Sequence, residues 1–150
     1  MTTYTDENGQ SIVLINPSLV GKASNRLTAD TFLHEMVHTL TVNAFNNPVS
    51  KEDRNLVSST KELYKMMNNI YPSEMYDKSN RESGMYALTN PKEFVAEFIS
   101  NKHTRDLVYK TAVQLDRESG KTLLGKIKSL INSITKFLVR KSLFATNEEK

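Results

Sequence analysis

Apolar side chains recur every three or four positions along most of the chain, which is the period of an amphipathic α-helix. Prolines and capping residues divide this pattern into segments. Pro48 ends the first segment, Pro72 ends the second, and Asn90 with Pro91 begins the third. The helices predicted in this way cover about residues 28–46, 50–71, 91–101, 103–117 and 121–143. We therefore expect a mostly helical protein.

Two segments depart from the helical pattern. Residues 11–16 (Ser-Ile-Val-Leu-Ile-Asn) are rich in β-branched side chains and stop before Pro17, which is typical of a strand. Residues 72–90 have no clear period and contain Gly84 among many polar residues, which predicts a surface loop. A strand beside several helices indicates the α+β class, with a small sheet.

Composition limits the chemistry that the chain can carry. Its 150 residues, 38% of them hydrophobic, are enough for one compact domain with a buried core. Because the chain has no cysteine, any metal must be bound by nitrogen and oxygen. The N-terminus has neither the basic start nor the apolar stretch of a signal peptide, and no apolar run is long enough to span a membrane. The sequence predicts a soluble protein, cytoplasmic or associated with a phage or an effector.

Charge is distributed unevenly along the chain. Residues 1–100 carry nine Lys/Arg and twelve Asp/Glu, whereas residues 101–150 carry eleven Lys/Arg and five Asp/Glu. The lysines of the helix predicted over 121–143 form its outer face, and we expect that helix to pack on the core with this face in water. Membrane contact through 121–143 is a less favoured alternative. Nucleic-acid binding is not expected, because no recognition motif accompanies the lysines.

The first predicted helix contains the run His34-Glu35-Met36-Val37-His38. Histidines four positions apart on a helix point the same way and offer two of the nitrogen ligands that zinc prefers. Glu35, next to the first histidine, is suited to act as a general base on a metal-bound water. The run should arise by chance in only about one of a few hundred chains of this length. It therefore predicts a zinc site.

A catalytic zinc site needs a third protein ligand and one open position. The metzincin pattern is excluded because Thr41 and Ala44 stand where it requires glycine and histidine. His103, the remaining histidine, is better explained as a solvated or helix-capping residue. Glu93 and Glu97 share one face of the helix predicted over 91–101, so a carboxylate from that helix is the better candidate.

The segment Tyr86–Phe98, which lies downstream of the histidine run, resembles the active-site half of the anthrax lethal factor catalytic domain and its relatives. Those relatives include metallopeptidase-like domains of phage and mobile-element polyproteins. The resemblance implies that Glu93 is the third zinc ligand and that Tyr86 stabilises the oxyanion or the leaving group. It also implies that Glu97 does not bind the metal itself but accepts a hydrogen bond from a ligand histidine.

The resemblance covers about residues 11–101 and is weak over 102–150. It implies a zincin-like catalytic core over 1–101, of the gluzincin type, with an active-site helix and a small sheet. The edge strand of that sheet, over 11–16, would pair with an extended peptide. Residues 102–150 would form a basic helical segment packed on the same domain.

These observations lead to two functional hypotheses. The first is a metallopeptidase with one Zn²⁺ ion, in which Glu35 is the general base and a protein or peptide is the substrate. The second is a zincin-like module of a phage or mobile-element protein that binds a partner, has a structural role, or acts only when tethered to its substrate.

Overall fold

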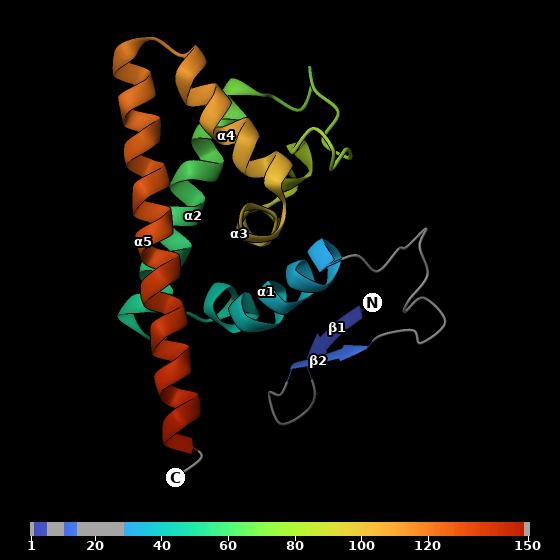
Figure 1. Cartoon of the computed structure of the whole chain (residues 1–150), viewed down its shortest axis with the longest axis vertical. Helices are drawn as coiled ribbons and strands as arrows, with labels where there is room; N and C mark the ends of the chain where they lie inside the picture. The colour runs from blue at the N-terminus through green and yellow to red at the C-terminus, as the bar shows by residue number, and fades with distance from the viewer. Residues whose placement is uncertain (1, 6–10, 15–28, 149–150) are drawn as a thin grey trace. The chain divides into compact units, whose positions relative to one another are not determined.

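The structure, a computed structural model, describes residues 2–5, 11–14 and 29–148, most of them in helices (Figure 1). Its elements are β1 (Thr2–Thr5), β2 (Ser11–Leu14), α1 (Ala29–Asn46), α2 (Lys51–Ile70), the 3₁₀ helix η2 (Met85–Thr89), α3 (Pro91–Ser100), α4 (Lys102–Gln114) and α5 (Arg117–Glu148).

The predicted α+β, zincin-like fold class is wrong, because the described fold is built from helices and belongs to the all-α class. In the part of the chain that is described, strands occur only as β1 and β2, which pair antiparallel with each other in a hairpin of four residues each. Residues 15 and 16 of the predicted strand lie outside the described residues. A lone hairpin gives no sheet on which a layer of helices can pack.

Capping residues explain where the helices begin. Ser50 and Asp53 form a capping box at the start of α2, and the Asn90 side chain accepts a hydrogen bond from the Glu93 backbone at the start of α3. The predicted bounds of α1, α2 and α3 are confirmed to within a residue or two. However, α5 begins earlier than predicted, because the Asp116 carboxylate accepts from the Ser119 backbone and hydroxyl and so starts a helix ahead of Gly120.

The chain divides into two compact units that interleave along the sequence. One unit comprises residues 1–42 and 77–107, and the other comprises residues 43–76 and 108–150. Both α1 and α4 therefore run from one unit into the other.

In the second unit, α2 and α5 lie side by side (Figure 1). Their facing apolar side chains are fully buried; they are Leu56, Leu63 and Met67 of α2 and Leu123, Ile127, Leu130 and Phe137 of α5. The hydroxyls of Ser59 and Ser133 share a hydrogen bond of 2.8 Å between the same two helices. No described helix has an apolar stretch long enough to cross a membrane.

In the first unit, η2 packs against α3 through buried Ala87, Leu88, Phe94 and Val95. The turn before η2 is tied to the start of α4, because the Thr104 hydroxyl donates to the Gly84 carbonyl at 3.3 Å. Gly84 has a φ of +82°, in the left-handed region that favours glycine. This anchor fixes where η2 begins.

We predict that Gly84→Ala destabilises the protein and that Gly125→Ala does not. A Cβ at Gly84 would lie 2.5 Å from the backbone oxygen of His103, and the positive φ costs an L-residue about 1–2 kcal/mol. A Cβ at Gly125 meets no atom within 4 Å, and alanine is favoured over glycine inside a helix by about 0.5–1 kcal/mol. Urea unfolding of both variants checks this, and equal stability of the two variants would contradict it.

Candidate metal centre

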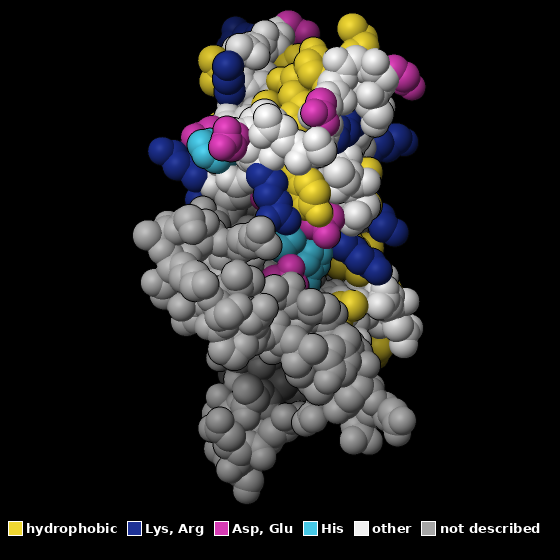
Figure 2. All heavy atoms as spheres, turned by 90° about the vertical axis from the view of Figure 1, so that its right-hand side faces the viewer, with side chains coloured by type: hydrophobic (Ala, Val, Ile, Leu, Met, Phe, Trp, Pro, Cys, Tyr) yellow, Lys and Arg dark blue, Asp and Glu magenta, His cyan; other side chains and the backbone are white. Residues whose placement is uncertain are grey.

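Helix α1 carries both histidines of the predicted zinc run on one face. His34 is buried, with 3% of its surface exposed, and His38 is half-buried one turn later. Their Nε2 atoms lie 2.9 Å apart, and the two rings meet edge to face. Figure 2 shows histidine side chains next to acidic ones on the surface of the described part of the chain. The helical spacing therefore brings two imidazole nitrogens to the same point.

Helix α3 brings a carboxylate to these nitrogens. Glu93 Oε2 lies 2.9 Å from His34 Nε2, and Glu93 Oε1 lies 3.2 Å from His38 Nε2. One ligand atom from each of the three residues lies within 4.8 Å of the others. His34, His38 and Glu93 thus form a group that could hold a metal ion.

The close contacts among His34, His38 and Glu93 are better explained by a shared metal cation than by hydrogen bonds. His34 Nε2 can carry only one proton, yet it faces both His38 Nε2 and Glu93 Oε2. Glu93 Oε2 is buried and accepts no well-aligned hydrogen bond from the described residues. Ligand atoms of a tetrahedral zinc lie roughly 3.3 Å from one another. The observed separations are therefore close to those that a shared metal requires.

The electrostatics keep the Glu93 carboxylate charged. Burial raises the pKa of the Glu93 carboxyl, but its polar contacts with the His34 and His38 rings outweigh this and lower the pKa to about 2. Glu93 is therefore ionised at neutral pH. One negative charge and two neutral imidazoles make a donor set that zinc accepts.

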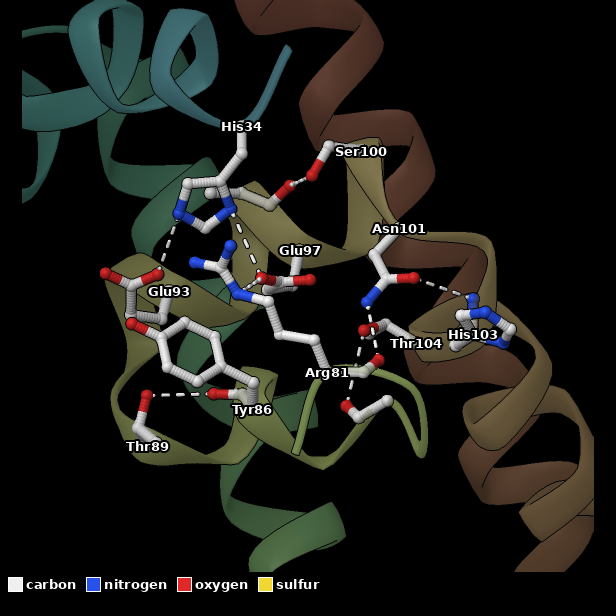
Figure 3. Close-up of polar contacts among 12 residues, drawn as sticks. His34, Arg81, Tyr86, Thr89, Glu93, Glu97, Ser100, Asn101, His103 and Thr104 are labelled. Carbon is white, nitrogen blue, oxygen red and sulfur yellow. Dashed lines mark hydrogen bonds and ion pairs between the residues drawn. The ribbon is translucent and has the colours of Figure 1, made fainter. Parts of the chain in front are cut away.

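Glu97 lies behind the ligands, one helical turn after Glu93. Its side chain is almost fully buried, and its Oε1 lies 3.2 Å from Arg81 Nε and 3.4 Å from His34 Nδ1, a contact too poorly aligned to count as a hydrogen bond (Figure 3). A carboxylate on the second nitrogen of a ligand histidine fixes the orientation and tautomer of the ring.

A cavity of about 400 Å³ opens beside His34 and Glu97 and is also lined by Thr31, Glu82 and His103.

The structure brings Tyr86 next to the candidate metal centre. Its ring centroid lies 6.5 Å from that of His34, and its backbone carbonyl accepts a hydrogen bond of 2.8 Å from the Thr89 hydroxyl within η2. Figure 3 shows the phenol oxygen on the same side as the Glu93 carboxylate. The predicted loop over 72–90 thus ends in a 3₁₀ turn that holds this ring beside the ligands.

Two further residues lie outside the ligand group. Glu35 sits half-buried on α1 between the two histidines. His103 is in the first turn of α4, where its backbone donates to Asn101 Oδ1 at 2.9 Å. Its side chain lines the cavity and takes no part in the group of converging ligand atoms.

No protein-family model, curated protein or solved structure matches the chain. What can be inferred about its function therefore rests on the residues of the site.

We predict that Glu97→Gln weakens zinc binding roughly 10–100-fold, which is the usual effect of losing the group that orients a ligand histidine. An amide can no longer offer a charged oxygen to His34 Nδ1. Glu82→Gln is the matched control, because Glu82 is an exposed carboxylate of the same cavity. Competition titration with a zinc chelator gives both affinities, and equal weakening in the two variants would contradict this role of Glu97.

Proposed function

We propose that this protein is a zinc-dependent metallopeptidase whose site is of the gluzincin type, as in the lethal factor catalytic domain that its motifs resemble. The observation that carries the proposal is the meeting of His34, His38 and Glu93 from two separate helices. Glu35 follows His34 directly in the sequence. Three protein ligands leave one coordination position for water or substrate.

Zinc is the metal that this donor set favours. Two imidazoles and one carboxylate are the ligands of many catalytic zinc sites, whereas magnesium and calcium prefer oxygen alone. When bound, zinc supplies an acidified water and polarises the carbonyl of the peptide bond.

The chain's own residues would move the protons. The Glu35 carboxylate accepts a proton from the attacking water and delivers it to the leaving amide nitrogen. The Tyr86 hydroxyl donates a hydrogen bond to the carbonyl oxygen as negative charge develops there. Glu97 keeps the His34 ring in its binding orientation, since its carboxylate lies against Nδ1.

We predict that Glu35→Gln keeps bound zinc but loses peptide hydrolysis by roughly a hundredfold or more, because the amide cannot accept the proton. His38→Ala should lose the zinc itself. His103→Ala is the control and should keep both, since His103 is outside the ligand group. Zinc content and cleavage of a peptide library are measured for all three variants.

Two results would contradict this proposal. Full zinc content in His38→Ala would remove the ligand assignment. Metal binding by the wild type with no cleavage of any peptide would instead favour a module that binds without catalysing or that requires a tether.

A further inference from the structure

Arg81, in the irregular segment before η2, touches two of the residues that surround the candidate metal centre. Its Nε lies 3.2 Å from Oε1 of the buried Glu97, and the central carbon of its guanidinium lies 4.5 Å from the centre of the Tyr86 ring. Figure 3 shows the guanidinium between these two side chains, on the side of His34. The planar guanidinium therefore contacts both Glu97, which lies against His34, and Tyr86, which lies beside the candidate metal centre.

The backbone of Arg81 is held in place independently of its side chain. The Asn101 amide donates to the Arg81 carbonyl at 3.0 Å, and the Gly84 backbone donates to the same carbonyl at 3.1 Å. The turn 81–84 is thus fixed against the junction of α3 and α4. A guanidinium that extends from a fixed turn has a defined reach, which suits it to orient its neighbours.

The contact with Glu97 acts on His34. Glu97 Oε1 faces both Arg81 Nε and His34 Nδ1, so the guanidinium selects the carboxylate rotamer that also meets the imidazole. A carboxylate buried to this extent needs a charged partner, and among the described residues Arg81 is the only arginine or lysine in ion-pair contact with it.

The contact with Tyr86 acts on the side of the candidate metal centre where water or substrate would bind. A guanidinium lying over a tyrosine ring attracts its face and limits the tilt of the ring. Lysine replaces this contact only in part, because its ammonium can be attracted to the ring but is a point charge without a flat surface to stack. The position of the Tyr86 hydroxyl thus depends on the shape of residue 81 as well as on its charge.

We propose that Arg81 is a positioning residue, which sets the His34 ring through Glu97 and the Tyr86 hydroxyl through stacking. This role rests on the metallopeptidase function proposed above. In this role, the segment before η2 aligns both the zinc ligand His34 and the oxyanion donor Tyr86.

The first test does not depend on catalysis. The chain has three histidines; in nitrogen NMR of zinc-loaded protein, a His103→Ala sample identifies the His103 ring, and a Glu97→Gln sample then distinguishes His34 from His38, because of these two rings Glu97 Oε1 faces only His34, at Nδ1. Arg81→Gln should shift or broaden the His34 Nδ1–H signal, and Arg81→Lys should restore it, because an ammonium can also pair with Glu97. Lys102→Gln, which removes one exposed positive charge from the same unit, should leave the signal unchanged. An unaltered signal in Arg81→Gln would overturn the contact through Glu97.

The second test uses peptide hydrolysis. Arg81→Gln and Arg81→Lys should each lower kcat by about tenfold or more with little change in KM, since a misplaced group costs rate rather than binding. At saturating zinc, the double variant Arg81→Gln/Tyr86→Phe should be no slower than Arg81→Lys/Tyr86→Phe. The two differ only in the contact with Glu97, and that contact acts mainly on metal retention.

The cycle of Arg81→Lys with Tyr86→Phe decides the stacking contact. If Arg81 acts through the Tyr86 hydroxyl, Arg81→Lys has no further effect on kcat once that hydroxyl is gone. Fully additive losses, or wild-type kcat in Arg81→Lys, would overturn this part of the proposal. If the wild type cleaves no peptide, the metallopeptidase function fails, while the NMR test still decides the contact through Glu97.

Discussion

The meeting of the Glu93 carboxylate with the His34 and His38 rings is the interaction on which the candidate site depends. Two elements supply it, because α1 presents both imidazoles on one face and α3 presents the carboxylate from its first turn. A buried carboxylate is costly unless it is paired, and the close imidazoles keep Glu93 ionised with a pKa of about 2. The group therefore combines the charge and the spacing of a metal site.

A second set of contacts holds this group in place. Glu97 lies against the far nitrogen of His34, Arg81 lies against Glu97 and Tyr86, and the Gly84 turn is tied to the start of α4. The irregular segment before η2 is thus as much a part of the site as the two helices. In a metal site of this kind, the outer contacts set the geometry that the ligands adopt.

The sequence predicted the residues of this candidate site because their signals are local. Two histidines four positions apart need only the helical period, and Asn90 with Pro91 marks the start of the helix that carries Glu93. The strand was predicted correctly over Ser11–Leu14, but the α+β fold class was wrong, since one β-branched run cannot show whether enough strands pair with it to form a layer. The interleaved units and the contact of Arg81 with Glu97 were beyond prediction, because both depend on residues that are distant in sequence and follow no period.

The central claim is that one metal ion is bound jointly by His34, His38 and Glu93. X-ray absorption at the zinc edge of the loaded protein tests it most directly. We expect a four-coordinate shell at about 2.0–2.1 Å with two imidazoles and the rest oxygen. A shell made of oxygen alone, or one that contains a single imidazole, would contradict the claim.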